Sequence, residues 1–142
     1  MIIVDANLLI YAVNRDAPLH GQAKVWLEQA ISGRETVGLP WNVLLAFLRL
    51  TTRPGLFRRP LSVATAVDLV SSWLERDSVT LIHPGPKHYQ LLRDLLLERG
   101  TGGNLTSDAH LAALAIEHGA QLCSLDGDFS RFPLLDWRNP LS

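Results

Sequence analysis

Apolar residues recur along this chain in two alternating patterns, short continuous runs and longer segments with helical spacing. Four short runs rich in branched aliphatic residues predict buried strands, because such runs suit a sheet that is covered on both faces. These runs occupy residues 1–5, 36–39, 79–83 and 121–124. The longer segments between them predict helices at residues 7–13, 18–32, 41–52, 63–74, 87–99 and 107–118.

Residues that start or stop helices stand at the borders of these segments. Ser62 can cap the helix that follows it, and Gly33 and Gly100 each follow the last residue of a helical segment. Residues 126–129 predict a turn or a helical start, and residues 134–137 predict a last edge strand. Strands that alternate with helices indicate a single α/β domain, with a central parallel sheet of four to five short strands and helices on both faces.

Acidic side chains stand where the predicted strands end. Asp5 closes the first strand, Asp126 and Asp128 follow the fourth, and Asp108 opens the helix before that fourth strand. Ligands of open parallel sheets bind beyond the carboxyl ends of the strands, so these carboxylates converge if the first and fourth strands are neighbours. A divalent cation such as Mg²⁺ or Mn²⁺ would relieve their mutual repulsion. The alternative is that each aspartate only suits its own turn or helix start.

Composition narrows the class of protein further. The chain has 142 residues, 47% of them hydrophobic, and a formal net charge of −1, so nucleic acid would have to be held by local patches. All basic residues except Lys24 and Lys87 are arginines, which suits phosphate contacts but equally reflects genomic base composition. The single cysteine, Cys123, excludes an internal disulfide and fits a reducing cytoplasm. No apolar run reaches membrane-spanning length, and the apolar N-terminus lacks the basic stretch of a secretory signal.

The chain resembles the PIN-domain family, in particular its VapC-type toxins, in two stretches. These are IIVDANLLIYA at residues 2–12 and NLTSDAHLAALAIEHGAQLCSLDGDFSRFP at residues 104–133. The resemblance implies a PIN-like three-layer sandwich and a metal-dependent endoribonuclease, the toxin of a VapBC-type toxin–antitoxin pair. It implies that water activated by Mg²⁺ or Mn²⁺ cuts the RNA and leaves 5′-phosphate and 3′-hydroxyl ends. The implied catalytic metal ligands, direct or through water, are Asp5, Asp108 and Asp126, with Asp128 as a further metal ligand.

One position departs from the family pattern. The family usually carries Glu-x-x-Arg on its third long helix, and this chain has Ala46-Phe47-Leu48-Arg49 there. Arg49 is expected to balance the acidic pocket or to contact phosphate. Asn42 lies one helical turn before Ala46 on the same face, and its amide oxygen is the candidate for replacing the missing carboxylate. The departure leaves a second interpretation open, a catalytically weak or silent PIN-like module that binds RNA or an antitoxin.

Three further polar residues are candidates for supporting roles at the site. Asn7 would hold the Asp5 carboxylate, and Ser124 resembles the family's Thr or Ser that positions phosphate or metal-bound water. Asn104 stands in the loop before the last long helix. For each of the three, a turn or capping role is the alternative. Cys123 is expected in the core, and the five histidines show no spacing typical of paired metal ligands.

The resemblance also implies macromolecular partners. The expected substrate is structured RNA such as tRNA, cut in an exposed single-stranded loop. Candidate RNA contacts, which would otherwise only be solvated loop residues, are Arg53, Arg58, Arg59 and Arg131. A homodimer and a VapB-like antitoxin are expected as well. Candidate aromatic residues for the contact with the antitoxin are Trp41, Phe57 and Trp73, of which Trp73 suits the core better.

Other Mg²⁺-dependent α/β proteins also place an aspartate after the first strand. A haloacid-type phosphatase needs a second aspartate two residues later, where this chain has Asn7. A phosphoacceptor domain needs its aspartate after the third strand, where this chain has His83-Pro84-Gly85. Both classes are therefore less favoured than the PIN-type nuclease.

Overall fold

The computed structural model describes residues 1–100 and 102–142 and contains a five-stranded parallel sheet in the order β3-β2-β1-β4-β5. Its strands are β1 (Ile2–Val4), β2 (Val37–Pro40), β3 (Val79–Ile82), β4 (Gln121–Cys123) and β5 (Trp137–Arg138). The helices are α1 (Ala6–Val13), α2 (His20–Ser32), α3 (Trp41–Thr52), α4 (Val63–Leu74), α5 (His88–Arg99), α6 (Leu105–Glu117) and the 3-10 helix η1 (Gly127–Arg131).

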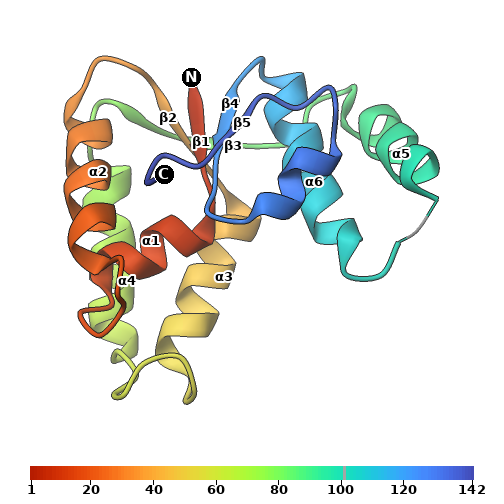
Figure 1. Ribbon diagram of the computed structural model, residues 1–142. Coiled ribbons are helices and arrows are strands. Elements are labelled where there is room, and N and C mark those ends of the chain that lie inside the picture. Colours follow the sequence, from red (N-terminus) through yellow and green to blue (C-terminus); the bar gives the residue numbers. More distant parts are fainter. Residues whose placement is uncertain (101) are drawn as a thin grey trace.

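The strand order determines which face of the sheet each helix covers. From β1 the chain moves outward to β2 and β3, and the connections contain α1 to α4. It then returns past β1 to β4 through α5 and α6. Because crossover connections between parallel strands are right-handed, reversing the direction moves the connecting helices to the opposite face. Figure 1 shows this division, with α1 to α4 on one side of the sheet and α5 and α6 on the other. The predicted α/β class with helices on both faces is confirmed.

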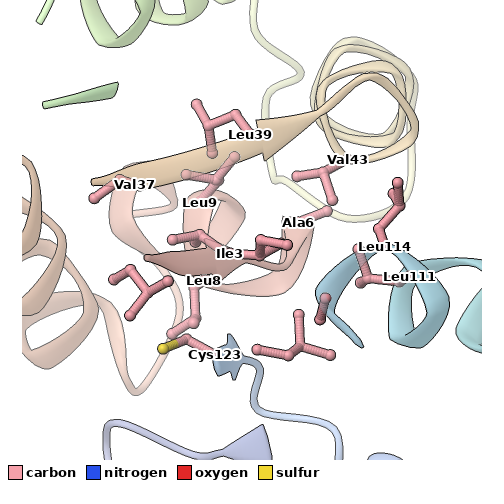
Figure 2. Packing of buried hydrophobic residues seen from close by; sticks show 14 of the residues in the cluster. Ile3, Ala6, Leu8, Leu9, Val37, Leu39, Val43, Leu111, Leu114 and Cys123 are labelled. Atoms are coloured by element: carbon pink, nitrogen blue, oxygen red, sulfur yellow. The ribbon is translucent and has the colours of Figure 1, made fainter. Parts of the chain in front are cut away.

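The core forms around the two central strands. Ile3 and Val4 of β1 are completely buried, as short aliphatic runs of this kind predict. Figure 2 shows Ile3 among residues from the neighbouring strands and from helices of both faces, which include Leu8, Leu9, Val37, Leu39, Val43, Leu111 and Leu114. Trp73 is buried and its ring meets Phe47 edge to face, with centroids 4.9 Å apart, so the preference for a core role is confirmed.

Cys123 also lies in the core, as expected, where burial raises the pKa of its thiol to about 11. A thiol with so high a pKa stays protonated at neutral pH, and the thiolate is the form that reacts. Cys123 is therefore a packing residue.

Several predicted boundaries differ from the structure by one or more residues; the helix predicted from residue 18, for example, begins at His20. Two of the differences affect the sheet edge and the site. The last edge strand, predicted at residues 134–137, is wrong in extent, because pairing with β4 involves only Trp137 and Arg138. The preceding residues form a turn, in which the Leu135 backbone N–H donates to the Phe132 carbonyl, and Leu134 is exposed. The last long helix begins at Leu105, two residues before the predicted start, so Asp108 lies in its first turn.

Among the described residues, every helix falls short of the length and apolar character that a bilayer crossing requires.

Candidate active site

The candidate site lies where the strand order reverses. β1 and β4 are parallel neighbours with Val4 opposite Cys123, so the residues that follow them emerge at the same edge of the sheet. The Asp5 backbone N–H donates to the Cys123 carbonyl at 3.0 Å, which ties the two strand ends together. The condition set by the sequence, that the first and fourth strands be neighbours, is met. Crevices of this kind are the usual ligand sites of open α/β sheets.

The buried hydroxyl of Ser124 organises this edge. It donates a hydrogen bond to Asp5 Oδ2 at 2.7 Å and accepts one from Asn7 Nδ2 at 3.1 Å. It also accepts one from the Asp126 backbone N–H at 3.1 Å. Asn7 Oδ1 in turn accepts from the Leu125 backbone N–H at 3.3 Å. Residues from the ends of β1 and β4 are therefore held in one hydrogen-bonded network.

Asp5 is fixed from two sides. Its Oδ1 accepts from the Ala6 backbone N–H at 2.7 Å, so the same carboxylate that meets Ser124 also caps α1. Asn7 Nδ2 lies 3.5 Å from Asp5 Oδ2. Capping and a place in the acidic site, which the sequence posed as alternatives, are thus compatible for this residue.

A cleft of about 580 Å³ opens beside this network. Asp5 and Asp108 line it together, although Asp5 follows β1 and Asp108 lies in α6, and α3 supplies Asn42, Ala46 and Arg49 to its wall. Ser107 lines it too and was not among the residues singled out from the sequence. Its only sequence signal was its place beside Asp108 at a helix start.

The carboxylates of the site repel one another. Burial, and then repulsion from the other three aspartates, raises the pKa of Asp108 to about 6. Burial raises the pKa of Asp5 as well, although hydrogen bonds from Ser124 and Ala6 lower it in part. Arg49 is an exposed cation on the cleft wall and makes no ion pair within the described residues. The cleft thus holds partly buried negative charge that a bound cation would stabilise.

Asp126 and Asp128 lie at the border of the site. Asp126 Oδ1 accepts from the Asp128 backbone N–H at 2.9 Å and so caps η1. The exposed Asp128 carboxylate lies 3.6 Å from Arg131, where the two form an ion pair. Both carboxylates raise the pKa of Asp108, so they belong to the same field of charge, but neither lines the cleft.

Two other residues predicted for the site, Asn42 and Asn104, differ in whether they reach the cleft. Asn42 lines the cleft, and its Oδ1 is fully buried without a hydrogen-bond partner. Asn104 is exposed at the start of α6, where its side chain makes no capping hydrogen bond, and it does not line the cleft.

The described residues bring no three His, Cys, Asp or Glu side chains close enough together to hold a metal ion by themselves. They do contain one histidine pair that spacing did not predict, with His88 Nε2 and His110 Nδ1 2.9 Å apart between α5 and α6. The two residues are 22 positions apart, and only the packing of α5 on α6 brings them together.

A larger cleft, of about 620 Å³, lies between the end of α1 and the second half of the loop that joins α3 to α4. Its charged lining is mostly basic, with Arg15, Lys24, Arg58 and Arg59 against the single acid Asp16. This larger cleft lacks a pair of carboxylates. The smaller, acidic cleft is therefore the candidate for chemistry despite its lesser volume.

Comparison with known proteins agrees with this geometry. The PIN-domain family model matches residues 2–135. Ribonuclease VapC37 of Mycobacterium tuberculosis is 48% identical over 140 residues, which cover 99% of this chain and 97% of that protein.

Solved structures with the same fold include VapBC2 from Rickettsia felis, bound to a DNA fragment from its promoter. It has a TM-score of 0.71 and 20% identity, and the match covers 97% of this chain and 98% of that one. VapC20 of Mycobacterium tuberculosis, a Sarcin-Ricin loop cleaving toxin, has a TM-score of 0.70 and 23% identity, with 92% and 94% covered. Family match, sequence identity and fold agree, and this chain belongs to the PIN-domain family as one of its VapC-type proteins.

Proposed function

We propose that this chain is a metal-dependent endoribonuclease, the toxin of a VapBC-type pair. The observation that carries the proposal is the convergence of Asp5 and Asp108, which lie far apart in the sequence, on one cleft at the switch point of the sheet. Their raised pKa values indicate charge that lacks a counterion inside the protein. The ribonuclease VapC37, 48% identical over nearly the full length, supports the same activity.

The donor set of the cleft fits Mg²⁺ or Mn²⁺. Mg²⁺ keeps several of its waters and is held by one or two carboxylates, which suits two aspartates better than a closed cage of ligands. Asp5 and Asp108 would hold the ion, and Asp126 would act on it through water. A bound divalent ion supplies activation of water and neutralises charge on the scissile phosphate.

The chain's own residues then have separate roles. Ser124 and the Ala6 N–H fix the Asp5 carboxylate, so it does not reorganise when the substrate binds. Arg49 would contact a phosphate at the cleft wall, because it is exposed there and free of ion pairs among the described residues.

Structured RNA such as tRNA is the proposed substrate. Arg58 and Arg59, which make no ion pair within the part of the chain that the structure describes, form a local basic patch with Arg15 and Lys24 on a chain whose net charge is −1. A local patch of this kind is what an acidic chain needs to hold phosphate. VapC20, which shares the fold, is a Sarcin-Ricin loop cleaving toxin.

A VapB-like antitoxin and a second copy of the chain are the proposed protein partners. VapBC2 of Rickettsia felis and VapBC-1 of nontypeable Haemophilus influenzae share this fold. Trp41 and Leu45 are about half exposed in the first half of α3, the helix that lines the acidic cleft, and large exposed apolar side chains of this kind suit contact surfaces.

The test compares the wild type with Asp5→Asn on an RNA pool, in Mg²⁺, in Mn²⁺ and in EDTA. We expect discrete products from the wild type with metal, and none from the variant or in EDTA. Asp77→Asn, which neutralises an exposed carboxylate far along the chain from the site, is the matched control and should cleave normally. Equal cleavage by Asp5→Asn would overturn the assignment.

A catalytically silent PIN module is the second candidate, and Ala46 favours it because this position of the cleft wall carries only a methyl group. Binding of Mn²⁺ and RNA by the wild type, without cleavage under any metal condition, would select this alternative.

A further inference from the structure

Asn42 lines the acidic cleft, and its side-chain oxygen is a buried acceptor without a partner. Asn42 is the second residue of α3 and lines the cleft with Asp5 and Asp108. Its Oδ1 is buried and has no hydrogen-bond partner. A buried acceptor without a donor is unfavourable, because the oxygen loses its hydrogen bonds to water on folding and forms none within the protein.

The cleft lining contains two side chains that could donate, Ser107 and Arg49, but neither hydrogen-bonds the Asn42 Oδ1. Ionised Asp5 and Asp108 can only accept hydrogen bonds. Ala46, one turn later on the same helix face, contributes only a methyl group to the cleft wall. A divalent cation in the cleft would satisfy this oxygen, because amide carbonyl and carboxylate oxygens together form the donor set that hard divalent cations prefer.

We propose that Asn42 Oδ1 completes the oxygen set that holds the divalent cation, beside the carboxylates of Asp5 and Asp108. Asn42 is neutral, so it adds an oxygen without adding to the repulsion that already exists among the aspartates. The small side chain of Ala46 leaves the space over this face of α3 open to the ion and its waters. This inference rests on the proposed metal-dependent function.

The direct test measures Mn²⁺ affinity by electron paramagnetic resonance titration of the full-length protein. We expect Asn42→Ala to weaken Mn²⁺ binding about 10-fold or more, the range found when oxygens that support a metal site are removed. Asn42→Asp should retain or tighten binding, because it keeps an oxygen at the same place and adds charge. Gln22→Ala removes an exposed amide from α2 and should bind like the wild type.

A rescue variant separates ligation from packing. In the double variant Asn42→Ala/Ala46→Glu, a carboxylate one turn away on the same cleft wall should restore most of the lost Mn²⁺ affinity. The metal-free Asn42→Ala protein should melt at or above the wild-type temperature, because it loses an unsatisfied acceptor. A merely structural asparagine would instead lower the melting temperature and leave Mn²⁺ affinity unchanged.

The outcomes distinguish this inference from the function on which it rests. Wild-type Mn²⁺ affinity in Asn42→Ala, with binding abolished in Asp5→Asn, would overturn the role of Asn42 and leave the metal site standing. Absence of Mn²⁺ binding by the wild type would overturn both. Loss in Asn42→Ala together with rescue by Ala46→Glu supports the proposal.

Discussion

At the scale of single residues, the hydroxyl of Ser124 shows how closely the acidic edge is built. A serine hydroxyl has one donor and two acceptor positions, and all three are used, toward Asp5, Asn7 and the backbone of Asp126. The residue is completely buried, so water cannot replace any of these bonds. The network fixes the Asp5 carboxylate relative to β4.

Ser124→Ala therefore removes three hydrogen bonds at once and leaves buried polar groups unpaired. We expect a loss of about 2 kcal/mol in the free energy of unfolding, the range for unsatisfied buried partners. Urea denaturation followed by circular dichroism measures it. Ser130→Ala, at an exposed position on η1, should change stability by less than about 0.5 kcal/mol. Equal stability of the two variants would contradict the importance of the network.

Asp108 makes the stability of the metal-free protein depend on pH. Its pKa is raised from 3.8 to about 6, so between these values the folded state binds more protons than the unfolded chain. Stability then falls as the pH rises through this window and stays lower above it. We expect the free energy of unfolding of metal-free Asp108→Asn to exceed that of the wild type by about 1 kcal/mol near neutral pH, a value discounted for solvent screening. Near pH 3.8, the lower end of the window, the two proteins should be equally stable.

Urea denaturation of both proteins across this pH range, in EDTA, checks the sign. Asp77→Asn serves as the control, because the Asp77 carboxylate is exposed and makes no ion pair within the described residues. Its removal should therefore leave stability nearly unchanged. A metal-free Asp108→Asn protein that is less stable than the wild type at neutral pH would show that the carboxylate is not repelled.

At the scale of elements, Glu117 at the end of α6 binds the turn that leads into α5. Its carboxylate accepts from the backbone N–H groups of Gly85 at 2.8 Å and Lys87 at 2.9 Å. A Cβ added to Gly85 would lie 2.6 Å from the Glu117 carboxylate, so a larger residue here would push that carboxylate out of place. The contact holds the start of α5 against the helix that carries Asp108.

Gly85→Ala should therefore destabilise the fold by displacing Glu117, at a cost of about 1–2 kcal/mol for the lost hydrogen bonds. In the Glu117→Ala background the same substitution should cost almost nothing, because the clashing group is gone. This non-additivity, measured by a double-mutant cycle of urea denaturation, is the expected signature. Additive effects would show that the added Cβ meets something other than Glu117.

At the scale of the whole molecule, the strand order separates an acidic cleft from a basic one. The acidic cleft lies at the switch point between β1 and β4, and the basic cleft lies between the end of α1 and the second half of the loop that joins α3 to α4. This division allows a chain of net charge −1 to present cations to phosphate while carboxylates hold a metal ion.

We expect the double variant Arg58→Ala/Arg59→Ala to bind single-stranded RNA about 10-fold more weakly. The slope of log affinity against log salt should fall by about 1.4, which corresponds to two phosphate contacts. Fluorescence anisotropy at several salt concentrations measures both. Arg76→Ala/Arg93→Ala removes the same charge from arginines already paired with Glu28 and Asp94, and should change the slope little. Equal slopes for both double variants would exclude a role for the basic cleft.

The sequence by itself determined the alternation of strands and helices and the carboxylates that follow the strands. Both are local properties, because the periodicity of apolar residues and the residue after a strand can be read without knowing what lies nearby. The resemblance to the PIN domain, carried by residues 2–12 and 104–133, added the family, which the comparisons confirmed.

Only the tertiary structure decided which of these residues meet. Strand neighbours depend on pairing between segments more than 100 residues apart, so the contact of Ser124 with Asp5 and Asn7 had no local signal. The same holds for the histidine pair between α5 and α6. Burial also depends on the packed environment, and for that reason the raised pKa of Asp108 and the unpaired oxygen of Asn42 appeared only when the chain was folded.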